Sequence, residues 1–270
     1  MTFKTSSNQD AETLTLVRSA TIIVSLAGLR LLVDPMLDDV GARPGIEGST
    51  RPVRNPLVPL PFPADEVIAG IDAVLVTHTH SDHLDETALS LLPRNVPVFC
   101  QPEDEALLRG HGLLAQAVPN STSTSWRGVS ITRTGGQHGH GPLARELGPV
   151  SGFVLDDAYI AGDTVWCDEV AATIARFRPR TAIVNGSGAR LGGSEPLVMD
   201  VGDVARVTEL VPRVIVVHLE AIGHCLETRA RVREHVPTAI VPEDGETIRL
   251  YPPTRLCPRS EPRNSNKAGR

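Results

Sequence analysis

The sequence has few aromatic residues, few cysteines and no long uninterrupted hydrophobic run. Phe, Trp and Tyr make up only 3% of the 270 residues, whereas 41% are hydrophobic, so a core must be built from aliphatic side chains. The four cysteines are far apart and form no Cys-x-x-Cys pair, which favours reduced thiols over a disulfide framework. The most apolar segments, 21–32 and 211–217, are interrupted by Arg, Gly or Pro and are too short to span a bilayer. We therefore expect no membrane insertion.

The charge balance argues against a nucleic-acid partner. The formal net charge is −6, and Lys and Arg form no cluster of the kind that phosphate contacts need. Residues 1–12 are polar and lack the apolar stretch of an export signal. These features predict a cytoplasmic protein that acts on a small molecule.

The chain reads as one continuous domain framed by two short tails. The segments 1–12 and 252–270 are polar and have little to bury, so the predicted domain spans 13–251. Residues 41–63 are rich in Pro and Gly and predict a long surface loop, which in a compact domain is usually functional. The hydrophobic patterns predict strands at 14–17, 21–26, 29–33, 71–77, 96–100, 128–133, 152–155, 158–161, 181–185 and 213–218, with short final strands, and helices at 85–92, 103–109, 169–176, 201–210 and 229–235.

The predicted strands and helices occur in a similar order in the two halves of the chain. This order predicts an α/β fold with two sheets face to face and helices outside, a four-layer αβ/βα sandwich. A doubly wound Rossmann-like sheet is the alternative. Its glycine-rich fingerprint is missing after every predicted strand, so the sandwich is favoured.

Seven of the nine histidines fall into three clusters, and each cluster follows a predicted strand or lies in a Gly-rich loop. Only His111 and His235 stand apart. Sites in open α/β sheets are assembled at such strand ends. The clustered histidines are His78, His80 and His83, then His138 and His140, then His218 and His224.

The first cluster carries the strongest signal for a metal site. Three histidines and two acids fall within eight residues, 78–85, directly after a predicted buried strand. In an extended chain residues two apart face the same way, so we expect His78, His80 and Asp82 to converge while His83 turns elsewhere. Imidazole nitrogen with carboxylate oxygen suits zinc, and manganese or iron are alternatives. A single histidine here would be unremarkable, but the whole cluster predicts metal.

The pattern His78-x-His80-x-Asp82-His83 resembles the signature of the metallo-β-lactamase superfamily. Later elements match in order, namely His138 after two glycines, Asp163 in Ala-Gly-Asp-Thr, and His218 at the end of a predicted strand. The resemblance covers essentially residues 13–250. Within the superfamily, the segment 33–36 and the Ala-Gly-Asp-Thr element are most similar to the branch that contains ascorbate-6-phosphate lactonase.

The resemblance implies a two-metal site in which a hydroxide between the two ions is the nucleophile. One ion would polarise the bond attacked, the other would stabilise the leaving oxygen, and Asp82 would orient the nucleophile and take a proton. The resemblance assigns the ligands of the first metal as His78, His80 and His138, those of the second as Asp82, His83 and His218, and the bridging ligand as Asp163.

Several neighbouring residues have two interpretations each. His224 is taken with Asp82 as catalytic, yet it and His140 can equally be ligand supports, substrate contacts or ordinary loop histidines, and His224 can also replace His218 as ligand. Asp85 can brace a ligand histidine or simply cap a helix. Cys167 can approach the site, although a buried structural thiol is favoured for it and for Cys225.

Two further segments are candidates for substrate contact. Residues 185–188, Asn-Gly-Ser-Gly, can line the pocket or form a plain strand-to-loop turn. Arg43, Arg51 and Arg54 in the 41–63 loop would suit an anionic substrate, and solvated surface charge is the alternative.

The favoured function is metal-dependent hydrolysis of a small ester-like bond, foremost a lactone, as the branch resemblance implies. The alternatives are a phosphodiesterase acting on a small nucleotide or phospholipid, and a binding protein that holds metal without turnover. The resemblance disfavours β-lactam hydrolysis, because those enzymes are normally exported, and a redox di-iron role, because His80 stands where that group has glutamate. Branch relatives are often oligomeric, so the resemblance allows a homo-oligomer, but the sequence leaves the oligomeric state open.

Overall fold

The computed structural model describes residues 12–252 of the chain. The tails expected at 1–12 and 252–270 therefore lie outside the described residues, apart from Glu12 and Pro252. Among residues 12–252 no helix has the length and apolar character needed to cross a membrane.

The first sheet has seven strands in the order β13-β1-β2-β3-β4-β5-β6. Its antiparallel part is a meander of β1, β2 and β3 flanked by β13, and its parallel part runs from β3 to β6. The strands are β1 (Thr13–Arg18), β2 (Thr21–Leu26), β3 (Leu29–Val33), β4 (Ala73–Leu75), β5 (Pro97–Cys100), β6 (Leu114–Ala117) and β13 (Thr247–Arg249).

The second sheet has six strands in the order β12-β11-β10-β9-β8-β7. Strands β10, β11 and β12 are parallel to one another, and the others pair antiparallel. The strands are β7 (Ser123–Trp126), β8 (Val129–Gly135), β9 (Ser151–Leu155), β10 (Ala158–Ile160), β11 (Thr181–Asn185) and β12 (Val214–Val217).

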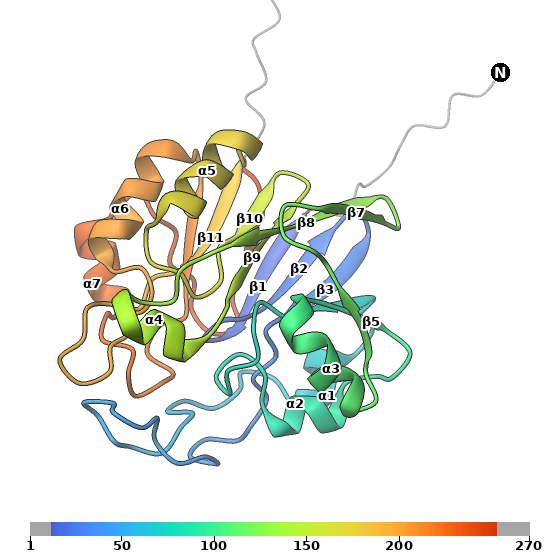
Figure 1. The fold of residues 1–270 in the computed structure, drawn as a ribbon, viewed down its shortest axis with the longest axis horizontal. Coiled ribbons are helices and arrows are strands. Elements are labelled where there is room, and N and C mark those ends of the chain that lie inside the picture. The colour runs from blue at the N-terminus through green and yellow to red at the C-terminus, as the bar shows by residue number, and fades with distance from the viewer. Residues whose placement is uncertain (1–11, 253–270) are drawn as a thin grey trace, which may run out of the picture.

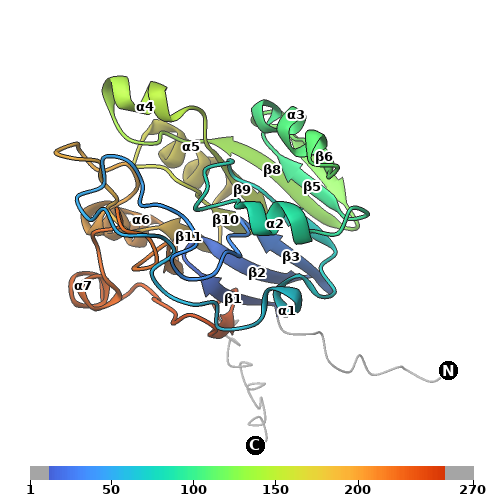
Figure 2. The ribbon, with the colours of Figure 1, turned by 90° about the horizontal axis from the view of Figure 1, so that it is seen from below.

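The helices cover the outer faces of both sheets, which gives the four-layer sandwich (Figures 1 and 2). Helices α1 (Ala64–Ile68), α2 (Glu86–Leu91) and α3 (Pro102–Gly110) pack on the first sheet. Helices α5 (Asp168–Phe177), α6 (Val201–Leu210) and α7 (Arg229–His235) pack on the second. The predicted fold class is therefore confirmed.

Three aliphatic clusters hold these layers together. The central one joins the facing sides of the two sheets, for example Leu31 and Leu75 with Phe153 and Ile183. Each outer cluster joins a sheet to its helices. In α5 the side chains that face the sheet include Val170 and, one turn on, Thr173 and Ile174, as the 3.6-residue period requires.

The 41–63 segment forms no helix or named strand and is anchored by a buried arginine. Arg18 is fully buried and donates hydrogen bonds to the carbonyls of Met36, Asp38 and Val58. Burial lowers the pKa of the Arg18 guanidinium to about 10. The arginine thereby fastens both ends of the loop to β1.

The short elements that the sequence patterns do not indicate are α1, β6, β7 and α4 (Gly141–Leu147). Strands β6 and β7 are edge strands with alternating exposed positions and few large apolar side chains. Helix α4 buries none of its own residues. Each of these segments is short and buries at most one residue, so it lacks the repeated hydrophobic period from which elements are predicted.

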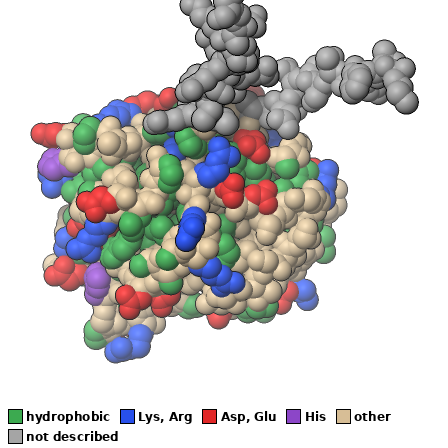
Figure 3. Space-filling view, turned by 90° about the horizontal axis from the view of Figure 1, so that it is seen from above, with side chains coloured by type: hydrophobic (Ala, Val, Ile, Leu, Met, Phe, Trp, Pro, Cys, Tyr) green, Lys and Arg blue, Asp and Glu red, His purple; other side chains and the backbone are tan. Residues whose placement is uncertain are grey.

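The ends of the parallel strands place the chemistry-bearing residues at one edge of the sandwich. Asp34 follows β3, His78 follows β4, Asp163 follows β10 and His218 follows β12. Helix α4 lies over this edge (Figure 1). On another face, shown in Figure 3, acidic and basic side chains are interspersed and form no continuous basic surface.

Candidate metal centre

The segment that follows β4 turns sharply between its second and third histidines. His83 N and Leu84 N both donate to the carbonyl of His80 at 2.9 Å. The expectation that His78, His80 and Asp82 converge was therefore wrong, because the turn ends the extended chain at His80. His78 and His80 do meet, with Nε2 of the first 3.0 Å from Nδ1 of the second, whereas Asp82 lies with His83.

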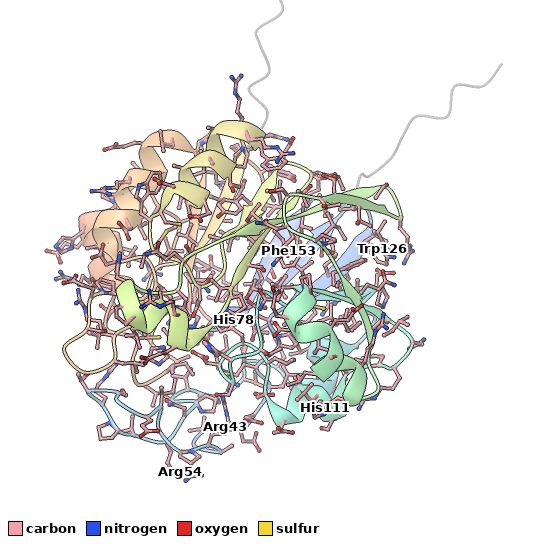
Figure 4. All side chains as sticks on the ribbon, viewed as in Figure 1. Arg43, Arg54, His78, His111, Trp126 and Phe153 are labelled. Carbon is pink, nitrogen blue, oxygen red and sulfur yellow. The ribbon has the colours of Figure 1, made fainter. Side chains whose placement is uncertain are left out.

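The predicted site residues come together in three overlapping groups. Within each group the ligand atoms lie within 4.8 Å of one another. Figure 4 shows His78, which belongs to two of them, near the centre of the view between α4 and α3. The groups are His78 with His80 and His138, His78 with His83 and Asp163, and Asp82 with His83 and His218.

Backbone carbonyls at the end of α4 and in a loop orient two histidines of the first group, His80 and His138. His80 Nε2 donates to the carbonyl of Leu147 at 3.1 Å, which leaves Nδ1 facing the cluster. His138 Nδ1 donates to the carbonyl of Leu197 at 3.0 Å, which leaves Nε2 facing Asp163. A ligating histidine in a metalloprotein commonly donates its other ring nitrogen in this way, which fixes the tautomer.

Side chains orient the histidines of the other groups. Asp34 Oδ2 accepts from His83 Nδ1 at 2.8 Å, and Ser187 Oγ lies 3.2 Å from His218 Nδ1. The opposite nitrogens, Nε2 of His83 and of His218, are buried and make no hydrogen bond of acceptable geometry with any described residue. His83 Nε2 instead lies 3.2 Å from Asp163 Oδ1.

This donor set fits divalent metal ions. Buried imidazole nitrogens without hydrogen-bond partners are costly unless a cation uses them, and these nitrogens face two carboxylates. The predicted ligands are all buried except His80, which is partly exposed. Imidazole nitrogen with carboxylate oxygen is the donor chemistry of zinc, manganese and iron sites.

The carboxylates and imidazoles of the cluster shift one another's pKa values. Burial opposes ionisation of Asp82 and Asp163, yet the surrounding histidines hold the pKa of both carboxyls well below its usual value. Burial likewise opposes a charge on His83, but Asp163 and Asp34 raise the pKa of its imidazole to about 10. The pKa of His218 is raised well above its usual value against burial, with Asp163 as the main cause. The two carboxylates thus create a strong preference for positive charge.

Asp163 is held in place by a tight turn and by a neighbouring amide. Gly162 adopts a φ of 68°, and a Cβ at this position would overlap the carbonyl oxygen of Ser151. Asn185 Nδ2 donates to Asp163 Oδ1 at 2.6 Å. Asn185 therefore supports Asp163 and does not line the cavity described next, as was considered for the 185–188 segment.

A cavity of about 230 Å³ opens beside the cluster. His224 lies on it, is 4% exposed, and places Nε2 3.7 Å from Asp82 Oδ2. Among the described residues that line the cavity none is Lys or Arg. The lining comprises the polar His80, Ser81, Asp82, His138 and His224 and the aliphatic Ile46, Leu147, Leu191 and Leu197.

The arginines of the 41–63 loop are engaged in holding backbone. Arg43 pairs with Asp38 Oδ2 at 2.7 Å and donates to the carbonyl of Ser81. Arg51 donates to the carbonyls of Gly223 and Cys225, and Arg54 to those of residues 41 and 42. Figure 4 shows Arg43 and Arg54 in this loop. Arg43 and Arg51 connect this loop to other segments, Arg54 holds carbonyls within it, and none of the three lines the cavity.

The other four candidate residues lie at the starts of helices or pack beside neighbouring side chains. Asp85 caps α2 by accepting from Ala88 N at 2.8 Å, as the capping interpretation holds. His140 precedes α4 and is exposed. Cys167 precedes α5 and lies 3.6 Å from a hydroxyl, Thr164 Oγ1. Cys225 is buried, with Sγ 3.5 Å from His218 Nδ1.

Sequence reasoning missed the supports of the histidines in the candidate metal cluster. Asp34 had a detectable signal, an acid directly after a buried strand at the edge where the histidines gather. The carbonyls of Leu147 and Leu197 had none, because a backbone oxygen is common to every residue type.

Comparison with known proteins places the chain in a family. The family model of the Beta-lactamase superfamily domain matches residues 29–219. A UPF0173 protein of Bacillus subtilis is 34% identical over 250 residues, covering 87% of this chain and 98% of that protein. The chain belongs to the UPF0173 family of the metallo-β-lactamase superfamily. A UPF0173 metal-dependent hydrolase of Methanocaldococcus jannaschii is 30% identical over 54% of this chain and 68% of that protein.

Two solved structures share the fold of this UPF0173 protein at substantial identity. An isothiocyanate hydrolase from Delia radicum gut bacteria is 35% identical with a TM-score of 0.82, covering 89% of this chain and 100% of that one. A possible metal-dependent hydrolase from Veillonella parvula is 32% identical with a TM-score of 0.84, at 89% and 100% coverage. The protein is accordingly a metal-dependent hydrolase, as the sequence predicts. The ascorbate-6-phosphate lactonase-like branch is not shown by these comparisons.

Proposed function

We propose that the cluster binds two divalent ions and that the protein hydrolyses a small uncharged molecule at an electrophilic carbon. The unpartnered nitrogens of His83 and His218 and the three ligand groups support two adjacent sites. Zinc suits these donors best. Such a pair of ions supplies Lewis-acid activation of water and of the bond attacked. The proposed ligands are His78, His80 and His138 for one ion, Asp82, His83 and His218 for the other, and Asp163 for both.

Asp82 and His224 are the side chains proposed to act on the substrate and on water. Both line the cavity, and the His224 imidazole lies 3.7 Å from the Asp82 carboxylate. Asp82 is placed to orient an attacking water and to accept its proton. The Nδ1 atom of His224 has no hydrogen-bond partner among the described residues, so it is available to a polar atom of the substrate.

The lining of the cavity is the observation that supports a small uncharged substrate. Ile46, Leu147, Leu191 and Leu197 give it an aliphatic wall, and none of its described lining residues is Lys or Arg. An anionic phosphodiester would meet no cation from these side chains. A small apolar group would instead gain about 25 cal/mol per Å² buried against the aliphatic wall.

An isothiocyanate is the first substrate class to test. It is uncharged, small and electrophilic at carbon, and the isothiocyanate hydrolase noted above aligns over its whole length. In the reaction water adds to the central carbon of R–N=C=S, its protons pass to nitrogen, and the C–N bond breaks. The products are the amine R–NH₂ and carbonyl sulfide, which balance one water consumed. A lactone, which the sequence resemblance favours, would fit the same wall and is the second class.

The test is a turnover assay on metal-loaded protein with three substrates of similar size. These are a short-chain alkyl isothiocyanate, an alkyl lactone and a chromogenic phosphodiester, with Asp82→Asn as the blank. We expect isothiocyanate loss above the blank with one amine formed per molecule consumed. Turnover of the lactone alone would move the substrate to the ester class, and preference for the phosphodiester would overturn an uncharged substrate.

Two variants test the cavity and the histidine separately. Leu191→Lys places a cation in the aliphatic wall and should raise KM, whereas Leu210→Lys, at a residue that is 55% exposed, should not. His224→Gln should lower kcat about 100-fold, at the low end for a group that moves protons, with exposed His235→Gln as control. Unchanged kinetics in the first member of either pair would contradict the corresponding role.

A further inference from the structure

His80 differs from the other clustered histidines because two segments outside the strands, at the end of α4 and the start of α3, fix its position. Its ring is held from one side by the Leu147 carbonyl, 3.1 Å from Nε2. Its backbone is held from the other side through Thr79, whose hydroxyl donates to Asp104 Oδ1 at 3.0 Å. Leu147 ends α4, and Asp104 lies in the first turn of α3. The placement of His80 therefore depends on how these two segments are held relative to each other.

One buried carboxamide joins the two segments. Gln101, which precedes α3 and is 1% exposed, donates through Nε2 to Asp104 Oδ2 at 3.0 Å and to the carbonyl of Pro149 at 2.9 Å. Pro149 is two residues beyond Leu147. The other end of the amide, Oε1, accepts from Ser151 Oγ at 2.8 Å.

The hydrogen-bond network continues to a buried arginine. Every polar atom of the Gln101 amide has a hydrogen-bond partner in it. Arg133 NH1 donates to Ser151 Oγ at 2.8 Å, so the hydroxyl is free to donate only to Gln101. Both hydrogens and the oxygen of the Gln101 amide then have partners, which fixes which end is nitrogen and which is oxygen. A fully satisfied buried network of this kind is rigid and specific in geometry.

We infer that Gln101 is a positioning residue for His80 and thereby for one of the two proposed ions. The inference rests on the proposed function, since it takes His80 as a ligand of the ion shared with His78 and His138. Gln101 touches neither the substrate cavity nor any of the proposed ligands. It acts through Asp104 and Thr79 on one side of His80 and through the 147–149 segment on the other.

The consequence is a selective weakening of one metal site. Gln101→Leu keeps a side chain of similar size but removes the hydrogen bonds to Asp104 and to the carbonyl of Pro149. Partners in direct contact with a ligand typically change metal affinity by 10–100-fold. Because Gln101 acts one step further away, we expect about a tenfold loss for one ion and no change for the other.

The experiment titrates metal-free protein with Zn²⁺ against a chelator and resolves the two binding steps. Gln101→Leu is compared with Gln116→Leu, the same chemical change at an exposed position of the edge strand β6. Circular dichroism at the titration temperature confirms that each variant is folded. The visible spectrum of the Co²⁺-loaded protein reports ligand geometry independently of activity, and it should change for Gln101→Leu alone.

Thr79→Val keeps the proposal testable if Gln101→Leu does not fold. This nearly isosteric change removes only the hydroxyl that donates to Asp104, and it should weaken the same ion by a smaller factor. Wild-type affinity for both ions in Gln101→Leu or Thr79→Val, or equal loss of both ions, would overturn the role of Gln101. His80→Ala separates the two proposals: if it retains both ions with wild-type affinity, the ligand assignment itself fails.

Discussion

Asp34 offers the sharpest test of how the ligand histidines are prepared for metal. Its carboxylate is 2% exposed and accepts from Thr77 N at 2.8 Å through Oδ1. Its Oδ2 accepts from Thr77 Oγ1 at 2.7 Å and from His83 Nδ1 at 2.8 Å. When an ion displaces the second proton of the His83 imidazolium, Asp34 keeps the remaining proton on Nδ1, so that Nε2 would present its lone pair to the ion.

Asp34→Asn reverses this arrangement with little change in shape. The amide oxygen can still accept from Thr77 N, but the amide nitrogen replaces Oδ2 and presents a hydrogen to His83 Nδ1. His83 must then carry its proton on Nε2, where it blocks a metal. The backbone adds little, because asparagine tolerates the left-handed φ of 46° as aspartate does. Loss of such a support costs about 10–100-fold in metal affinity, or about 1.4–2.7 kcal/mol.

The assay is chelator competition on folded, metal-free protein, with Asp39→Asn at an exposed position as the matched control. We expect the ion held by His83 to weaken in Asp34→Asn alone. The difference should persist at high salt, because the contact is buried and salt screens chiefly exposed charges. Wild-type affinity for both ions in Asp34→Asn would refute the tautomer argument.

Three further outcomes follow from the described contacts. Gly162→Ala should destabilise the metal-free protein by about 3 kcal/mol in chemical denaturation, because its Cβ would overlap Ser151. Gly128→Ala, whose Cβ would meet no atom within 4 Å, should cost only the about 1–2 kcal/mol of a left-handed backbone conformation. Equal losses would contradict the overlap. Asn185→Leu should weaken metal binding about 10–100-fold in chelator competition, because it removes the donor that orients Asp163. Chelation should abolish hydrolysis and added Zn²⁺ should restore it; activity that survives full metal removal would rule out metal-dependent catalysis.

The sequence predicts the membership of the cluster well because its chemistry is local to strand ends. Each of His78, Asp163 and His218 follows a strand whose apolar run is easily recognised, and parallel strands bring such ends together. The core strands and the helices α5, α6 and α7 are found for the same reason, since each buries a continuous apolar face.

What the sequence does not predict depends on turns and on backbone. The alternation expected for His78, His80 and Asp82 fails because residues 80–84 form a turn, and no Gly or Pro marks it. The supports from Leu147 and Leu197 are carbonyl oxygens of residues distant in sequence. The three loop arginines are a third case, because composition alone does not distinguish a charge that meets substrate from one that holds neighbouring carbonyls.

We propose that seven side chains form two adjacent metal sites that share Asp163. The most direct measurement is the metal content of dialysed protein for the wild type and for His138→Ala and His218→Ala, each of which removes a proposed ligand of a different ion. We expect two ions per chain in the wild type and one in each variant. One ion or none in the wild type, or two ions retained in both variants, would contradict it.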